Sequence, residues 1–435
     1  MNILFLVRRY NQLDHIAPII YRLTQDTGHQ SLLFTINPSL RLSEDYRARY
    51  LVEKCGAVVD SIYRHPIPKS SRTDRSDKLM WTPGMNFVRR LVARVDTKHS
   101  FLWRIFSEAW ARQLLRNLQV EALVVDWQKP GRHRSLQVLS AARQLGVPVI
   151  AVPHAIPLQA NDLITSRQAK RGAPGSYEFN SRFFDLIIAP HEQFAKRLIR
   201  GAIPHTKTRV AGSARFCDEW KSILRTIGPH RQPVDQDRRV RSTLNVVFFD
   251  HDRKYRIDPK IVESAVDRVS RVASVNLVVV PGVGSHQLSP EKSRHAYAIG
   301  QSTDALALIE WSDVVMTTTS SIVIDAILLD KIFIYPKYFH LNEMIFEEYQ
   351  FCRTALDDDQ LVKMLEEIWE TDIEKRVPLA HNQSAKRFIT EVVYGGKPDR
   401  DVLTNYKKCI ENIALRFKAQ RGFLNVETLA ISKVD

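Results

Sequence analysis

Residues 312–336 read SDVVMTTTSSIVIDAILLDKIFIYP, and this stretch decides how the chain folds. The apolar runs at 314–316 and 332–335 predict two short buried strands. Between them, apolar side chains recur at helical spacing over 322–329. A strand, a helix and a strand in this order form a βαβ unit, which places both strands in one parallel sheet.

The same alternation of strands and helices continues on both sides of this unit. Apolar runs predict further strands at residues 2–7, 30–36, 58–63, 122–125, 148–152, 184–189, 208–211, 244–249 and 275–280. Helical spacing predicts helices at residues 13–25, 135–144, 259–272, 303–310, 359–370, 382–392 and 400–418, and one more that starts at 192. Alternation on this scale is typical of doubly wound parallel sheets.

One stretch, residues 222–242, interrupts this pattern. It contains Gly228-Pro229, Pro233 and five arginines, a composition typical of an exposed linker. We therefore expect an α/β chain with two doubly wound, Rossmann-like domains at residues 1–221 and 243–395. The linker joins them, and a helical tail follows at 396–435. Ligands of such sheets bind at the carboxyl ends of the strands, so we expect the site in a cleft between the two domains.

The charge is concentrated in the first half of the chain. Residues 1–240 hold 38 Lys and Arg against 20 Asp and Glu, whereas residues 241–435 hold 25 against 28. A half with a net charge of +18 is suited to an anionic partner, such as an acidic polymer or an anionic membrane leaflet. The alternative is that the charge only keeps the protein soluble.

The densest basic stretch runs from residue 69 to residue 116. Apolar residues recur there at helical spacing over 87–95, with Arg89, Arg90 and Arg94 between them, and again over 101–110. A basic amphipathic helix of this kind can lie on a membrane surface. The pattern fits equally a helix whose apolar side packs in the core. No RNP-type or zinc-finger motif is present, so a nucleic-acid partner is not expected.

The composition and the absence of several motifs exclude other classes of protein. The chain is 44% apolar and 26% charged, as in soluble globular proteins, and its four cysteines form no Cys-x-x-Cys pair. No apolar run approaches the ~18–20 residues that span a bilayer, and no signal-peptide pattern is present, so we expect a cytoplasmic chain. Dinucleotide-binding, Walker A, zincin and hydrolase motifs are also missing, which disfavours dehydrogenases, P-loop kinases, zincins and α/β-hydrolases.

The strongest candidate site is the run of five hydroxyl residues between the strand at 314–316 and the helix at 322–329. Its members are Thr317, Thr318, Thr319, Ser320 and Ser321. Hydroxyls and free N–H groups at such a turn can bind an anion, and a diphosphate fits well. A plain N-cap would need only one serine. Asp325 follows one turn into the helix.

The second candidate is His154, which follows the strand at 148–152 and lies between Pro153 and Pro157. Imidazole titrates near neutral pH and can act as a general base. A lone histidine can also be structural, and the sequence leaves this choice open.

Three further loops follow predicted strands. Gly212-Ser213-Ala214-Arg215 can bring Arg215 to a phosphate. The loop after residue 249 offers Asp250, His251 and Arg253 to a charged donor, although Asp250 and Asp252 also resemble a metal-binding pair. A weaker candidate is the loop with Gly284, Ser285 and His286.

In this order, the motifs resemble those of the CDP-glycerol glycerophosphotransferase family of bacterial cell-surface polymer synthesis. That family carries His-Gly-Thr-Pro-Leu, and residues 154–158 match it at His154, Pro157 and Leu158. It carries Thr-Asp-Tyr-Ser-Ser followed by Asp, which Thr317, Ser320, Ser321 and Asp325 match in register. Arg215 lies where the family has a Gly-x-x-Arg segment, and residues 394–400 are similar to its tail signature. The resemblance covers about residues 145–410.

The resemblance implies a GT-B fold, with an acceptor-side domain first and a nucleotide-donor domain second. It implies that His154 is the base and that the Ser-Ser region binds donor phosphate, with no metal or other cofactor. The family's Lys-x-His-Pro segment is replaced by Val-Val-Pro-Gly at 279–282, and its Thr-Trp-Arg by the loop at 250–253. The donor therefore stays open between CDP-glycerol, another CDP-polyol, a CMP-sugar and a UDP-sugar.

The opening residues 1–23 and the whole layout are also similar to UDP-N-acetylglucosamine 2-epimerases, which share the GT-B fold. Those enzymes need acidic residues in the cleft, and the sequence does not single these out. We expect a transferase of cell-surface polysaccharide or teichoic-acid-like polymer synthesis, with a glycan or lipid-linked acceptor, at work in the cytoplasm or on the inner face of the membrane. The alternatives are an epimerase and a non-catalytic polysaccharide-assembly partner.

Overall fold

A computed structural model describes residues 1–25, 28–65, 107–127, 135–153, 155–160, 183–228, 243–250, 257–281, 296–298, 305–371, 382–397 and 401–431, with side chains up to 421. The chain divides into two compact units. The first comprises Met1–Ala155, Tyr177–Gly228 and Tyr394–Asp435. The second comprises Ile156–Ser176 and Pro229–Val393. The chain therefore passes from one unit to the other directly after the predicted histidine motif begins.

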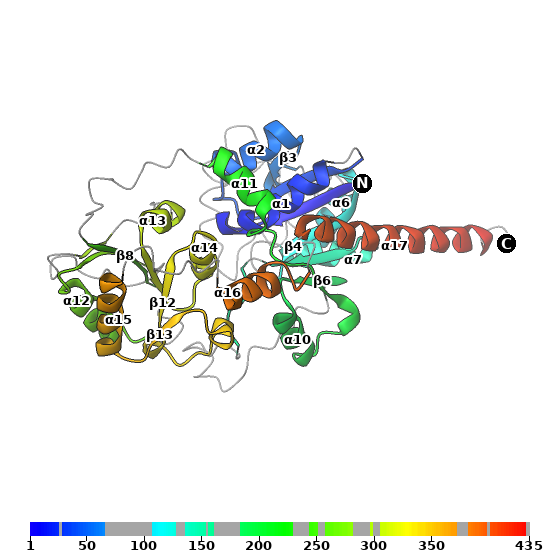
Figure 1. Cartoon of the computed structure of the whole chain (residues 1–435). Coiled ribbons are helices and arrows are strands. Elements are labelled where there is room, and N and C mark those ends of the chain that lie inside the picture. The colour runs from blue at the N-terminus through cyan, green and yellow to red at the C-terminus, as the bar shows by residue number, and fades with distance from the viewer. Residues whose placement is uncertain are drawn as a thin grey trace. The chain divides into compact units, whose positions relative to one another are not determined.

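The first unit is built on a parallel sheet in the order β3-β2-β1-β4-β5-β6-β7. Its strands are β1 (Asn2–Val7), β2 (Gln30–Thr35), β3 (Val58–Ser61), β4 (Val120–Asp126), β5 (Val149–Val152), β6 (Leu186–Ala189) and β7 (Thr208–Val210). The helices are α1 (Leu13–Thr24), α2 (Tyr46–Cys55), α6 (Glu108–Asn117), α7 (Ser135–Gln144), α10 (Glu192–Arg200), α11 (Asp218–Ile227) and α17 (Val402–Ile431) (Figure 1). The strand order reverses between β1 and β4.

The second unit repeats this topology, with the strand order β10-β9-β8-β11-β12-β13. Its strands are β8 (Leu244–Phe249), β9 (Val275–Val280), β10 (Ala296–Ala298), β11 (Val314–Thr317), β12 (Ile332–Pro336) and β13 (Arg353–Ala355). The helices are α12 (Pro259–Ser270), α13 (Ala305–Trp311), α14 (Ile322–Leu328), α15 (Asp358–Glu370) and α16 (Gln383–Phe388). Here the order reverses between β8 and β11.

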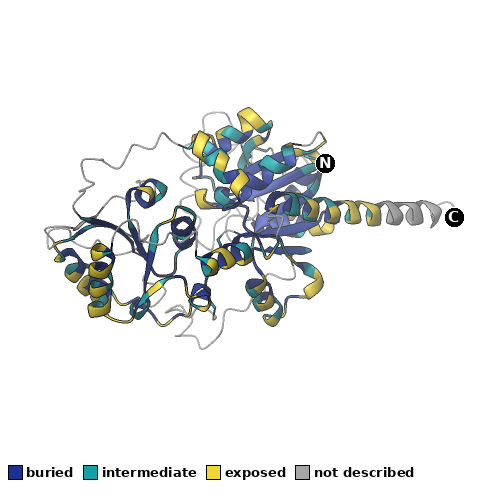
Figure 2. Cartoon of the chain, in the orientation of Figure 1, coloured by how far each residue is buried: buried dark blue, intermediate teal, exposed yellow. Residues whose placement is uncertain are grey.

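Burial explains why the strands are continuous apolar runs. In β1, β4, β5, β6 and β8 nearly every residue is buried, because helices cover both faces of a doubly wound sheet (Figure 2). Each unit has its own core. Phe34 and Trp110 are buried in the first, and Phe248 and Phe339 pack edge to face in the second.

The predicted α/β architecture of two doubly wound domains with a C-terminal helix is confirmed. The predicted helix at 135–144 has these bounds in the structure, and the strand predicted at 244–249 is β8. Helix α2 and strand β13 were not predicted. The strand expected at 58–63 ends at Ser61, where a 3-10 turn, η3 (Ile62–Arg64), begins.

Two boundaries differ from those expected. Residues 222–227, assigned to the linker, continue helix α11, which buries Trp220 and ends at Ile227 before Gly228-Pro229. The residues expected to form a separate tail belong to the first unit. Tyr406 is fully buried there and donates a hydrogen bond to the carbonyl oxygen of Gly212 at 3.0 Å.

Of the basic stretch at residues 69–116, the structure describes only residues 107–116. Helix α6 begins at Glu108, so Trp110 is helical and buried, as the second apolar stripe predicted. Residues 66–106, with Arg89, Arg90 and Arg94, lie outside the described residues. Among the helices that the structure describes, none is long and apolar enough to cross a membrane.

Candidate functional site

The strongest predicted motif lies where the strand order of the second unit reverses. Strands β8 and β11 are parallel neighbours, and Phe249 and Thr317 are paired at their carboxyl ends. The Thr317 hydroxyl donates a hydrogen bond to the Phe249 carbonyl oxygen at 3.1 Å. Asp250, the next residue after β8, is buried and donates its N–H to the carbonyl oxygen of Val280 at 2.9 Å. The structure thus brings Asp250 and the hydroxyl turn to the same edge of the sheet, at the position where doubly wound folds bind ligands.

The five hydroxyls of this turn do not have the same role. Thr317 is committed to the bond with Phe249. The Ser320 Oγ accepts a hydrogen bond from the N–H of Ile322 at 3.3 Å and so serves the start of α14. Ser321 is the N-cap residue of α14, and its side chain makes no capping hydrogen bond. The hydrogen bond to the start of α14 therefore accounts for one of the five hydroxyls, that of Ser320.

Thr318 and Thr319 are the unusual members. They are 2% and 6% exposed, and within the described residues neither Oγ1 atom has a hydrogen-bond partner. A buried polar group without a partner costs about 1–3 kcal/mol, so such groups are rare unless something else satisfies them. The two adjacent hydroxyls lie at the edge of the sheet where doubly wound folds bind their ligands. Asp325, also buried, follows in the first turn of α14.

A titratable cluster lies at the end of the neighbouring strand β12. The Tyr335 hydroxyl lies 3.4 Å from His340 Nε2 and donates to Glu347 Oε1 at 3.4 Å. His340 Nδ1 accepts the N–H of Asn342 at 3.0 Å. Burial lowers the pKa of His340 to about 4, and burial together with Glu347 raises the pKa of Tyr335. This cluster was not predicted, although Tyr335 is the last residue of the strand predicted at 332–335 and Lys337 and His340 follow shortly after it.

The residues that end and follow the histidine motif bond to the loop after His340. Ile345 donates its N–H to the carbonyl oxygen of Leu158 at 2.8 Å, and Ala160 donates to that of Glu343 at 2.8 Å. These bonds hold residues 158–160 against the loop between η9 (Lys337–Phe339) and η10 (Ile345–Tyr349). Residues 157 and 158, which match the family motif, are therefore part of the second unit. His154 itself lies outside the described residues.

The first unit also carries charged residues where its strand order reverses. Arg8 directly follows β1, and Asp126 is the last residue of β4. Arg8 Nη2 lies 3.5 Å from Asp126 Oδ2, and the two residues are 9% and 7% exposed. A buried ion pair adds little net stability, so its position at this edge marks a candidate site. The sequence showed Asp126 only as the end of a strand. Parallel pairing of β1 with β4 is what brings it to Arg8.

Arg215 lies beside a second group of charges in the same unit. Its Nη1 atom is 3.5 Å from Asp14 Oδ2, and its guanidinium lies 4.8 Å from the Phe216 ring centroid. Asp14 also pairs with Arg47, whose Nη2 atom lies 2.6 Å from Asp45 Oδ2. The side chain predicted to reach a phosphate is thus held by a carboxylate in the structure.

Several predicted site residues lie outside the described part of the chain: His154, His251, Arg253, Gly284, Ser285 and His286. Their roles stay predictions. Within the described residues, no three His, Cys, Asp or Glu side chains come together in a way that could hold a metal ion.

Two doubly wound sheets of this order, with a long C-terminal helix returning to the first, define the GT-B class of fold, and comparison with solved structures shows the same class. UDP-GlcNAc 2-epimerase from Neisseria meningitidis, bound to UDP-GlcNAc, has a TM-score of 0.57 and 12% identity, covering 96% of this chain and 100% of that one. S. aureus MnaA with UDP also has a TM-score of 0.57 and 12% identity, with 95% and 97% covered. HepE from Anabaena, in complex with UDP and glucose, has a TM-score of 0.54 and 13% identity, with 95% and 99% covered. No family model and no curated protein matches the chain.

Proposed function

We propose that this protein is a GT-B transferase of bacterial cell-surface polysaccharide or teichoic-acid-like polymer synthesis. It moves a sugar or polyol-phosphate group from a nucleotide-activated donor to an acceptor hydroxyl. The observation that carries the proposal is the pair of buried hydroxyls of Thr318 and Thr319, which have no partner among the described residues. The fold likeness to proteins whose structures hold UDP or UDP-GlcNAc supports a nucleotide-linked donor.

In this mechanism the hydroxyl turn receives the phosphate oxygens of the donor. His154 takes the proton of the acceptor hydroxyl, whose oxygen then forms a bond to the anomeric carbon of a sugar donor or to the phosphorus of a polyol donor. The bond from that atom to the nucleotide breaks, and the electron pair leaves with the nucleotide phosphate. The hydroxyls stabilise the charge that develops on this leaving group, an effect that needs no reorganisation because the turn is already formed.

Nucleotide binding is the first test. Thermal unfolding is measured with CMP, CDP, UMP, UDP and GDP, because a ligand that binds only the folded protein raises the unfolding temperature. A shift with one base supports the proposal and names the donor class. If no nucleotide binds, the protein is not a nucleotide-dependent transferase and a non-catalytic assembly role is favoured.

Turnover is the second test, and it concerns His154. His154→Ala should keep nucleotide affinity within about threefold and lower turnover about 10²–10⁴-fold, the usual range for a lost general base. His205→Ala, at an exposed histidine, is the control and should change neither. Near-normal turnover in His154→Ala would remove His154 from the mechanism.

A nucleotide-sugar epimerase is the second candidate, favoured by Asp126. This carboxylate is buried where the strand order of the first unit reverses, and the sequence alone had not singled it out as a site residue. An epimerase needs no acceptor. Incubation of the protein with a UDP-sugar alone therefore separates the two functions, because only an epimerase would change the configuration of the sugar.

The acceptor is proposed to be glycan or lipid-linked, and the net charge of +18 on residues 1–240 supports docking to an anionic membrane surface. Each Lys or Arg near such a surface contributes about 1 kcal/mol. The protein should bind anionic vesicles but not neutral ones, and replacement of Arg89, Arg90 and Arg94 by Glu should abolish binding. Equal binding to neutral vesicles would indicate insertion of apolar side chains instead.

A further inference from the structure

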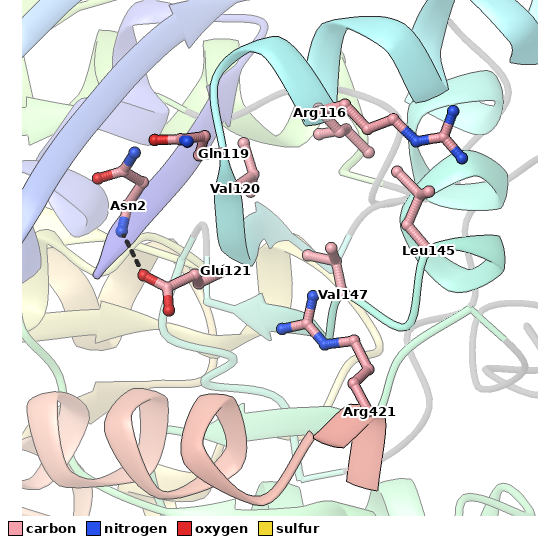
Figure 3. A pocket seen from close by; sticks show the side chains of 9 residues that line it. Asn2, Arg116, Gln119, Val120, Glu121, Leu145, Val147 and Arg421 are labelled. Carbon is pink, nitrogen blue, oxygen red and sulfur yellow. Dashed lines mark hydrogen bonds between the residues drawn. The ribbon is translucent and has the colours of Figure 1, made fainter. Parts of the chain in front are cut away.

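A pocket of about 460 Å³ lies at the edge of the first unit's sheet where β1 and β4 begin (Figure 3). Glu121 accepts hydrogen bonds there from the N–H of Asn2 at 3.1 Å and from Lys418 Nζ at 3.0 Å. Figure 3 shows the guanidinium groups of Arg116 and Arg421 directed apart. The lining of this pocket thus favours no single ligand.

The crossing between the two units is more informative. The chain passes from the first unit to the second between Ala155 and Ile156. Strand β5 ends at Val152 before the crossing, and Leu158, in the second unit, is fully buried after it. Five residues, 153–157, separate these two attachments, and the proposed base is one of them. The position of that base therefore depends on what holds the chain at Leu158.

Two backbone hydrogen bonds attach this crossing segment, residues 156–160, to the loop that precedes η10. Ile345 donates its N–H to the carbonyl oxygen of Leu158, and Ala160 donates its N–H to that of Glu343, both at 2.8 Å. The residues between these two pairs form an antiparallel bridge. The path of the crossing segment therefore follows the shape of this loop.

One carboxylate fixes the shape of the loop. Glu347 Oε1 accepts the N–H of Met344 at 2.8 Å, and Met344 lies between the two loop residues that bond to the crossing segment. The same oxygen accepts the hydroxyl of Tyr335, a fully buried residue of β12, at 3.4 Å. The other carboxylate oxygen forms an ion pair with Lys337. Glu347 thus connects the middle of the attachment to the sheet of the second unit.

We propose that Glu347 is a positioning residue of the transfer reaction and acts on His154 through the crossing segment. This inference rests on the proposed function, in which His154 takes the proton of the acceptor hydroxyl. A general base must lie within hydrogen-bond distance of that proton, and a displacement of about 1 Å can lower turnover about 100-fold. Without the carboxylate, the N–H of Met344 loses its acceptor and the attachment at Leu158 loosens.

The donor side should not be affected. The hydroxyl turn is held by its own hydrogen bonds, from Thr317 to Phe249 and from Ile322 to Ser320. Loss of Glu347 should therefore lower turnover and leave nucleotide affinity unchanged, a separation that general destabilisation of the second unit would not produce.

Hydrogen exchange of the full chain measures the attachment without any substrate. The amides of Ala160 and Ile345 should exchange about tenfold faster in Glu347→Ala, the effect of weakening roughly one hydrogen bond. The amide of Asp250, which bonds to Val280 in the same unit, should exchange at an unchanged rate. Equal exchange of Ala160 and Ile345 in both proteins would overturn the proposal.

Turnover in a double-mutant cycle tests the link to His154. Glu347→Ala should lower turnover about tenfold or more and keep nucleotide affinity within about threefold. Because Glu347 acts through His154, adding Glu347→Ala to His154→Ala should lower turnover no further. Additive losses would give Glu347 a separate role and overturn the proposal. If the unmodified protein transfers no group from any nucleotide-linked donor, the proposed function itself fails, and this inference fails with it.

Three further variants complete the test. Glu347→Gln keeps an oxygen that can accept from Met344 and should retain most of the turnover. Glu348→Ala removes the neighbouring, exposed carboxylate and should change neither exchange nor turnover. Glu347→Asp keeps the charge on a shorter side chain, and it should reproduce the losses in weaker form and replaces Glu347→Ala in the cycle if that variant does not fold.

Discussion

Thr317 donates its hydroxyl to the backbone carbonyl of Phe249 on the neighbouring strand, at a donor–acceptor distance of 3.1 Å. The bond joins β11 to β8 at their last paired residues, and it commits the first hydroxyl of the run to the sheet. The next two, Thr318 and Thr319, are just as buried but have no such partner within the described residues. Three consecutive threonines therefore combine one structural hydroxyl with two buried hydroxyls whose hydrogen-bond partner the described residues do not supply.

This difference predicts that replacing Thr318 or Thr319 affects stability and nucleotide affinity in opposite directions. Thr318→Val or Thr319→Val removes a buried hydroxyl without a partner and keeps the side-chain shape, so stability should stay equal or increase. Nucleotide diphosphate affinity should fall by about 1–3 kcal/mol, because a hydrogen bond to a charged group is lost. Urea denaturation and calorimetric titration measure the two effects separately.

Thr317→Val is the matched control. It breaks the bond to Phe249 and leaves a buried carbonyl oxygen without that donor, which should destabilise the protein by about 1 kcal/mol or more. If all three valine variants lose stability equally, Thr318 and Thr319 belong to the core and are not ligand groups.

The serine pair gives a second prediction. Ser320→Ala combined with Ser321→Ala should weaken nucleotide diphosphate binding by roughly 1–3 kcal/mol, the loss of two hydrogen bonds to a charged group. The nucleoside without phosphates should bind the variant and the unmodified protein equally. Equal losses for both ligands would mean that the serines hold the turn in shape, in line with the Ser320 hydrogen bond to Ile322.

Most of the fold could be predicted from the sequence because many of its strands are almost fully buried. Continuous apolar runs such as 244–249 and 2–7 can pair only inside a covered sheet, and the helices between them set the direction of each strand. Helix α2 was missed because its exposed side is charged and only Arg47, Ala48 and Leu51 are buried. The linker was predicted to begin at residue 222, although α11 continues to Ile227. Of the residues of this helix only Trp220 is buried, and it lies before the predicted linker.

The candidate site could be predicted only in part, because its residues come together through pairing between strands that lie far apart in the sequence. The run at 317–321 was visible as a local pattern. The pairing of Arg8 with Asp126 depends on β1 lying beside β4, which sequence alone does not reveal. The contact between Arg421 of α17 and Gly146 likewise joins residues that lie more than 270 positions apart in the chain.

Two glycines give a third prediction. Gly56 and Gly146 both follow a helix and both have a φ of 63°. Alanine in this left-handed conformation costs about 1 kcal/mol. A Cβ on Gly56 meets nothing within 4 Å, whereas a Cβ on Gly146 would lie 3.2 Å from Arg421 Cδ. Gly146→Ala should therefore destabilise the protein more than Gly56→Ala in urea denaturation. Equal stability losses in the two variants would show that Arg421 moves aside without cost.

His340 provides a prediction about pH. Burial lowers its pKa to about 4, against about 6.5 in the unfolded chain, so the folded protein binds this proton less readily than the unfolded chain does. The stability that results is complete above pH 6.5 and is lost as the pH falls toward 4. From this group alone, the free energy of unfolding should fall by about 2 kcal/mol between pH 7.5 and pH 4.5.

Urea denaturation at both pH values measures the change, with tryptophan fluorescence as the signal. His340→Gln has no imidazole to protonate, so its free energy of unfolding should fall by about 2 kcal/mol less over this range. His205→Gln removes an exposed imidazole instead, and it should lose as much stability as the unmodified protein. If His340→Gln and the unmodified protein lose stability in parallel, the buried cluster of Tyr335, His340 and Glu347 accepts the proton without unfolding, and other groups set the acid limit of the fold.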